Sequence, residues 1–127
     1  MDSLVKIVHD GSKNTSIQVT GQGKYDWITV VDLNKLNPVP REVRVDAVYY
    51  AVSEGMEVQF AWHSDLKRVP FLPLGGRGRI DFGEISGIHN NAKGKTGHIE
   101  MRTQGLSKDG IFTVILDLSK HIGVKDA

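Results

Sequence analysis

Apolar and polar residues alternate with a period of two over several segments of this chain, the pattern of β-strands with one buried face. The first strong alternation, at residues 42–49, puts four residues on one predicted face: Val43, Val45, Ala47 and Tyr49. The second, at residues 56–63, puts four more on a buried face: Met56, Val58, Phe60 and Trp62. The intervening Ser53-Glu54-Gly55 has the composition of a turn. The two segments are therefore predicted to form a β-hairpin.

The remaining strands are predicted from shorter runs. Residues 98–103 alternate, and the segment 111–118 places four apolar side chains on one face: Phe112, Val114, Leu116 and Leu118. Further strands are expected at residues 4–9, 16–20, 27–33, 69–74 and 79–85. No segment carries a sustained apolar stripe of helical period, so at most a turn or two of helix is expected, around residues 32–36 or at the C-terminus.

The 14 glycines support a fold of many short strands. They are spread along the chain without forming a repeat, as expected for tight turns between strands. We therefore predict an all-β fold, namely a two-sheet antiparallel β-sandwich of jelly-roll type with about eight strands and little or no helix. The 127 residues suffice for one domain. Within it, residues 1–24 are interpreted as an N-terminal arm or an edge hairpin, and residues 25–127 as the β-sandwich.

Charge and cysteine content narrow the class of protein. Lys+Arg 16 against Asp+Glu 15 leaves a net charge of +1, whereas proteins that bind nucleic acid through its phosphates usually carry a basic excess. The chain has no cysteine, so disulfides and thiolate metal sites are excluded. The first residues lack a signal-peptide pattern, and no apolar run reaches the ~20 residues of a membrane-spanning helix. We expect a soluble protein that binds neither membranes nor, as its main activity, nucleic acid.

The candidate chemical motifs lack the surroundings that their chemistry needs. No Gly-x-Ser-x-Gly nucleophile elbow is present, and the Gly-Lys-Thr at residues 94–96 has neither the upstream glycine nor the following helix of a phosphate-binding loop. The five histidines are not spaced as metal ligands, although His89 and His98 could meet across a hairpin. The sequence therefore predicts no enzymatic activity, no cofactor and no metal.

Three segments are candidates for contacts with other protein chains. The Gly-rich stretch at residues 75–79 carries two arginines, which suit a partner carboxylate better than a phosphate because a strand rather than a helix follows. A polar loop follows at residues 89–97, and the N-terminal stretch could add a strand to a neighbouring subunit. The candidate contact residues are Leu4, Val5, Ile7, Arg77, Arg79, Asn90, Asn91, Lys93 and Lys95.

A series of strand and turn motifs covers about three quarters of the chain. They are V-V-D at 30–32, R-V-D-x-V-Y-Y at 44–50, V-Q-F-A-W-H at 58–63, F-L-P-L-G-G at 71–76, I-D-F at 80–82, S-G-I-H-N-N-A at 86–92, G-K-T-G-H-I-E-M-R-T at 94–103 and F-T-V-I-L-D-L at 112–118. This succession resembles small virion structural proteins of tailed bacteriophages. The resemblance carries over no functional residue, because such families share interface surfaces rather than a catalytic signature.

The resemblance implies a capsid decoration, or cement, protein that binds the major capsid protein and stabilises contacts between its subunits. Such a protein would be made in the host cytoplasm, form homo-oligomers and reside on the capsid surface of the virion. Two other functions stay open. One is a β-sandwich that binds glycans or nucleic acid, for which Tyr25, Trp27 and Tyr50 are the candidate aromatic residues. The other is a tail or head–tail connector component.

Overall fold

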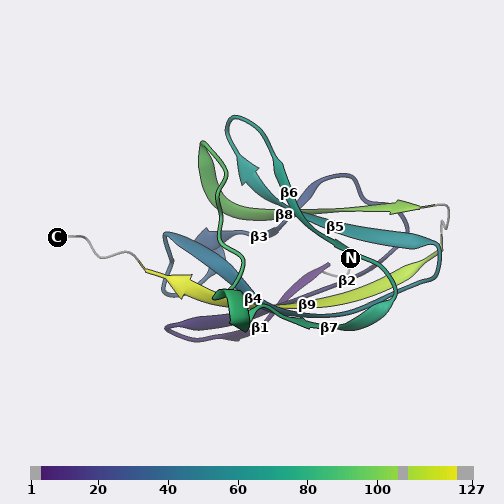
Figure 1. Cartoon of the computed structure of the whole chain (residues 1–127), viewed down its shortest axis with the longest axis horizontal. Helices are drawn as coiled ribbons and strands as arrows, with labels where there is room; N and C mark the ends of the chain where they lie inside the picture. Colours follow the sequence, from purple (N-terminus) through teal and green to yellow (C-terminus); the bar gives the residue numbers. More distant parts are fainter. Residues whose placement is uncertain (1–3, 106–108, 123–127) are drawn as a thin grey trace.

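The computed structural model describes residues 4–105 and 109–122, which form nine strands in two antiparallel sheets. Sheet A has the strand order β1-β2-β9-β4-β7, and sheet B has the order β3-β8-β5-β6. The two sheets lie face to face (Figure 1). The strands are β1 Val5–Asp10, β2 Asn14–Gln22, β3 Ile28–Val31, β4 Glu42–Val52, β5 Met56–Ser64, β6 Val69–Leu74, β7 Arg77–Asp81, β8 Lys95–Gly105 and β9 Ile111–His121.

The strand pairing confirms the predicted jelly roll. β2 pairs with β9, β3 with β8, β4 with β7 and β5 with β6, so the chain behaves as one long hairpin that is rolled into a sandwich. β1 adds a fifth strand to sheet A beside β2. Two short 3-10 helices, η1 at Leu33–Lys35 and η2 at Gly83–Ile85, are the helical elements of the described residues. The first coincides with the helical turn expected at residues 32–36.

The core lies between the sheets and contains the faces that alternation predicted. Met56, Val58, Phe60 and Trp62 on β5 are buried, as are the four predicted apolar residues of β9. Trp62 is 1% exposed, and its ring stacks on Phe71 with 4.3 Å between the ring centroids. Trp62 is thus a core residue and is not available to a ligand.

The predicted face of β4 is wrong from Ala47 onward. A β-bulge interrupts the pairing of β4 with β9 between Val45 and Ala47, and the extra residue moves every later side chain to the opposite face. Val48 consequently joins the core at 0% exposure, whereas Tyr49, expected inside, is 37% exposed on the outer surface. The strand still begins at Glu42 and ends at Val52.

The Gly-rich segment differs from its prediction as well. The expected loop at residues 75–79 contracts to a turn at Gly75 and Gly76, and β7 already starts at Arg77. Gly76 has φ +70°, which lets the chain reverse within two residues. The expected strand at residues 79–85 ends at Asp81, because η2 follows. Arg77 and Arg79 are therefore side chains of a strand at the edge of sheet A.

The described part of residues 1–24 is built into the sandwich. β1 and β2 form a hairpin, and β2 lies between β1 and β9 with Ile17 and Val19 buried in the core. At the C-terminal end of β1, Asp10 Oδ1 lies 2.6 Å from Nζ of Lys120 in β9, and the lysine side chain is fully buried. This ion pair connects the end of β1 to the end of β9.

Candidate functional site

The outer face of sheet A presents three rows of side chains across β2, β9, β4 and β7. The strand registers align these rows as Thr20, Thr113, Ala51 and Arg77; as Gln18, Ile115, Tyr49 and Arg79; and as Ser16, Asp117, Ala47 and Asp81. We call these twelve residues the outer face. Tyr49 occupies its middle row because of the bulge in β4.

The outer face differs in composition from the chain as a whole. Its four charged residues are arginine and aspartate, and its twelve positions contain none of the 10 lysines or 5 glutamates of the sequence. Tyrosine and arginine are enriched in protein interfaces. The outer face therefore has features of a surface that another protein covers.

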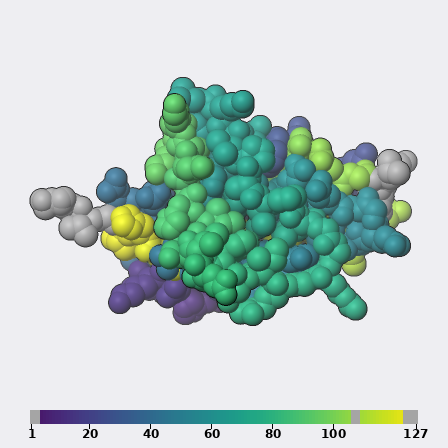
Figure 2. Space-filling view, in the orientation of Figure 1, coloured from purple at the N-terminus to yellow at the C-terminus, as the bar shows by residue number. Residues whose placement is uncertain are grey.

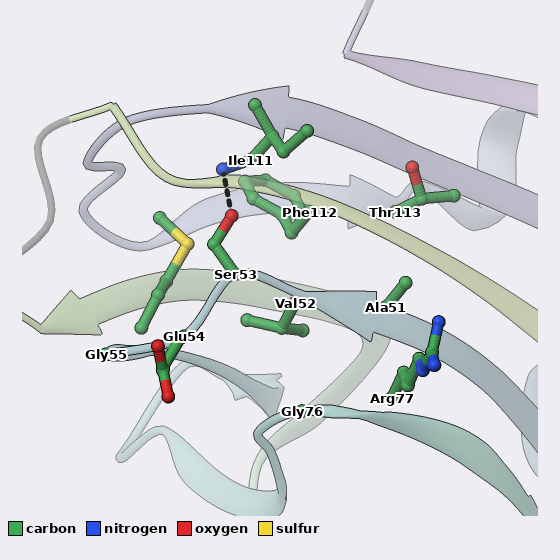
Figure 3. Close-up of a pocket in the computed structure, with 11 residues that line it drawn as sticks. Ala51, Val52, Ser53, Glu54, Gly55, Gly76, Arg77, Ile111, Phe112 and Thr113 are labelled. Carbon is green, nitrogen blue, oxygen red and sulfur yellow. Dashed lines mark hydrogen bonds between the residues drawn. The ribbon is translucent and has the colours of Figure 1, made fainter.

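An open hollow of about 640 Å³ adjoins this face at the end of the sandwich where β4, β7 and β9 meet. Ala51, Thr113 and Arg77 line both the hollow and the outer face, so the two are continuous. Figure 3 shows Ile111 and Phe112 on one side of the hollow and Gly76 and Arg77 on the other. Ile111 is 60% exposed, although its main-chain N–H donates to Ser53 Oγ at 2.9 Å. The hollow is suited to an apolar side chain of a partner.

The predicted contact residues Arg77 and Arg79 lie on this surface. The Arg79 guanidinium lies 5.2 Å from the centre of the Tyr49 ring and pairs with Asp81 at 3.3 Å. The contact with the Tyr49 side chain, followed by the charge of Asp81, raises the pKa of Arg79 above its ordinary value. Arg79 is thus cationic at every accessible pH and is held above the tyrosine ring.

The predicted contact loop at residues 90–95 requires one correction. Asn90 is 5% exposed, and its side-chain oxygen accepts the N–H of Ala92 at 3.0 Å, so Asn90 shapes the loop from inside. Asn91, Lys93 and Lys95 are exposed, and Lys95 donates to Glu42 at 3.2 Å and to the Asn90 carbonyl at the same distance. Only the last three remain candidates for contact with another chain.

The loop at residues 93–95 lies beside the turn between β5 and β6. Ser64 Oγ donates to the Lys93 carbonyl at 2.5 Å, and the Asp65 N–H donates to the Gly94 carbonyl at 2.9 Å. The two segments project together from the molecule (Figure 2), and Leu66 near their tip is 75% exposed. This projection is a second exposed feature, separate from the outer face.

The N-terminal candidates lie at the edge of sheet A opposite to β7. Leu4 and Val5 are half-buried and pack against the core, so their side chains already contact this chain. Ile7 is 38% exposed and lines an opening of about 240 Å³ between the sheets, with Val30 and Leu36 on the opposite wall. The structure therefore keeps these residues apart from Arg77 and Arg79.

The aromatic residues considered for glycan binding have partners within the chain. The guanidinium carbons of Arg68 and Arg102 lie 4.7 and 4.8 Å from the centre of the Trp27 ring. Tyr25 packs edge-on against Phe112, and Tyr50 is half-buried. Sugar-binding sites generally use an aromatic face that is free to stack. This arrangement does not favour a glycan site at these three residues.

The described residues contain no cluster of three or more His, Asp or Glu side chains that could hold a metal ion. His98 lies beside His63 rather than His89, with 6.3 Å between the ring centroids, and its Nδ1 accepts the Leu33 N–H. His89 instead contacts the Ser86 carbonyl. Within the same residues no helix has the length and apolar character needed to cross a bilayer.

No protein-family model matches the chain, and a search of curated proteins finds no match either.

Proposed function

We propose that this chain is a non-enzymatic structural protein that binds other protein subunits through the outer face and the adjoining hollow. The assembly that we propose is the capsid of a tailed bacteriophage, where the protein would act as a decoration protein on the major capsid protein. The observation that carries the proposal is the continuity between the outer face, whose twelve residues include no lysine or glutamate, and a largely apolar hollow with Ile111 60% exposed at its rim.

The proposed mechanism is preferential binding to the assembled shell. A protein that bridges two capsid subunits binds the intact joint and not the separated subunits, so it stabilises the joint by mass action. In this mechanism an apolar side chain of the capsid subunit fills the hollow, and the outer face covers flatter surface around it. Arg77, which lines the hollow, and Arg79 farther along β7 provide hydrogen bonds to carboxylates of the partner.

The direct test is cosedimentation of the purified protein with empty heads of the phage that encodes it. We expect saturable binding, and we expect Ile111→Glu to lose at least about tenfold in affinity because a carboxylate would be buried in the hollow. Thr29→Glu is the matched control, since it adds the same charge at an exposed position of sheet B. Equal binding by the wild type and Ile111→Glu, or no binding to heads at all, would refute the proposal.

The two alternative functions give different results in related experiments. A connector component would sediment with tails or with the portal vertex and would form rings, whereas a decoration protein would bind over the whole head surface. A nucleic-acid module would bind DNA with an affinity that falls steeply with salt. A glycan module would bind an array of oligosaccharides through residues other than the outer face.

A further inference from the structure

The four edge strands of the two sheets differ in how they are protected. Exposed edges are usually blunted by proline, by bulges or by short strands, since their free N–H and C=O groups otherwise recruit another strand. β6 carries Pro70 and Pro73, and β3 has four residues with a bulge after Thr29. β1 has a bulge between Ile7 and His9.

β7 is short and carries three charged residues, but it has neither a proline nor a bulge. It contains no proline, and its five residues pair in unbroken register with β4, from Arg77 opposite Ala51 to Asp81 opposite Ala47. Four of the five are exposed and the fifth, Ile80, is half-buried. Among the edges that the structure describes, β7 is thus the one that is ready to accept a further strand.

The hydrogen-bond pattern fixes which groups of β7 point outward. The Val52 N–H donates to the Gly76 carbonyl, and the Phe82 N–H donates to the Asp46 carbonyl. Even-numbered residues of β7 therefore direct their main-chain groups to β4. In an antiparallel ladder, alternate residues direct their N–H and C=O groups to opposite sides of the strand. The main-chain groups of Arg77, Arg79 and Asp81 therefore face the open edge.

We propose that β7 pairs with β7 of a second copy of this chain, antiparallel about a two-fold axis at Ile80, so that the two A sheets become one continuous sheet. In this register Arg79 of each copy lies opposite Asp81 of the other. Both residues direct their main-chain groups outward, as a hydrogen-bonded pair requires. The register shifted by two residues would instead place Arg79 directly opposite its own symmetry mate, which is unfavourable for like charges.

Two further features favour a second copy of the chain as the occupant. The edge is self-complementary in charge, because Arg79 and Asp81 exchange partners across the axis, and such isologous contacts are the commonest in homodimers. Ile80 would meet its mate at a position where the side chains of paired strands approach closely. In this register residues 79–81 of the two β7 strands lie opposite one another, and this short overlap buries less than the ~1,000 Å² of a stable interface, so we expect a weak dimer that forms at high concentration.

This inference rests on the proposed function for its biological setting, since paired copies would bring two outer faces side by side to bridge capsid subunits. The test is sedimentation equilibrium of the full chain from about 1 µM to about 1 mM. We expect the mass to approach twice the 14.0 kDa of one chain. Arg79→Asp and Asp81→Arg should each weaken the dimer by roughly tenfold or more, because each substitution replaces two opposite-charge pairs by like-charge pairs.

The double variant Arg79→Asp/Asp81→Arg restores opposite charges across the axis and should recover the dimer. The control is Lys6→Asp, which makes the same change of charge on the exposed part of β1, at the other edge of sheet A. Circular dichroism of each variant verifies the fold. A wild-type chain that stays monomeric at the highest concentration, or a double variant that stays dissociated, overturns the inference.

The two proposals can fail separately. A monomeric chain that still binds phage heads, with the loss described for Ile111→Glu, would overturn the β7 dimer alone. A dimer that is sensitive to the charge reversals but does not bind heads would overturn the capsid function alone.

Discussion

The buried ion pair between Asp10 and Lys120 allows the sharpest prediction about stability. The lysine side chain is 0% exposed and the aspartate side chain 20%, and their charged atoms lie 2.6 Å apart. The Asn37 N–H donates to the second oxygen of Asp10 at 2.8 Å. Asp10→Asn keeps the shape of the side chain but leaves the ammonium group of Lys120 buried without a counter-charge.

The expected loss of unfolding free energy follows from leaving one charge buried without its partner. Removing one partner of a buried pair typically costs about 3–5 kcal/mol, and the partial exposure of Asp10 places this site near 3 kcal/mol. With roughly 3–4 °C of Tm lost per kcal/mol in a domain of this size, Asp10→Asn should melt about 10 °C lower. Asp10→Asn/Lys120→Met removes both charges and should be more stable than Asp10→Asn alone.

The pH dependence provides an independent check. Burial alone would raise the pKa of Asp10, but the hydrogen bonds from Lys120 and the Asn37 N–H, with the charge of Lys120, hold the pKa below its ordinary value of 3.8. The native state therefore stabilises the carboxylate. This contribution is complete above the unfolded-state pKa of 3.8 and is lost as the pH falls through the lower folded-state value.

Urea unfolding followed by tryptophan fluorescence measures both effects, since Trp62 leaves the core on unfolding. At pH 7 the free energy of unfolding of Asp10→Asn should lie about 3 kcal/mol below that of the wild type, and the gap should narrow below pH 3.8. A difference in unfolding free energy between the wild type and Asp10→Asn of under about 0.5 kcal/mol at pH 7, or a difference that stays constant down to pH 2, would show that the ion pair does not stabilise the fold.

Three further substitutions test the packing and the outer face. Trp62→Ala should lower the free energy of unfolding by about 3–5 kcal/mol in urea titrations, because it removes the stacked partner of Phe71. Gly87→Ala should cost about 2 kcal/mol by thermal denaturation, since Gly87 has φ +85° and an added Cβ would lie 3.1 Å from the Val45 carbonyl oxygen. Tyr49→Glu should change the free energy of unfolding by less than about 1 kcal/mol in the same measurements, because the ring is 37% exposed, yet it should weaken head binding.

Regular alternation made the sandwich predictable, and the bulge in β4 limited that prediction. On β5 and β9 every residue of the predicted buried face lies in the core, although Ala61 on the other face of β5 is buried as well, so sequence reasoning found the core residues there. On β4 the residues Ala47 and Val48 are both buried, one on each side of the strand, and a sequence cannot tell which one the bulge displaces. The choice depends on pairing with β9, a strand more than sixty residues later.

The candidate surface was harder to predict for the same reason. Arg77 and Arg79 were identified as candidates because of the glycines beside them. Tyr49, however, was assigned to the core. The alignment of both arginines with β4 exists only in the folded sheet. The burial of Asn90 combines a local hydrogen bond, from the Ala92 N–H to its side-chain oxygen, with the packing of the loop that leaves Asn90 5% exposed. Residue type alone marks asparagine as polar and therefore as a candidate for the surface.

The bulge in β4 links the core to the proposed function. Without the extra residue, Val48 would face outward and Tyr49 would have to enter the core, where its hydroxyl would need a buried hydrogen-bond partner. With it, Val48 fills the core and Tyr49 lies under the guanidinium of Arg79, the residue that we place at the dimer contact. A bulge at the centre of a sheet weakens the local ladder, and natural proteins use bulges to redirect a side chain. The position of this bulge is therefore expected to matter for folding, through Val48, and for binding, through Tyr49.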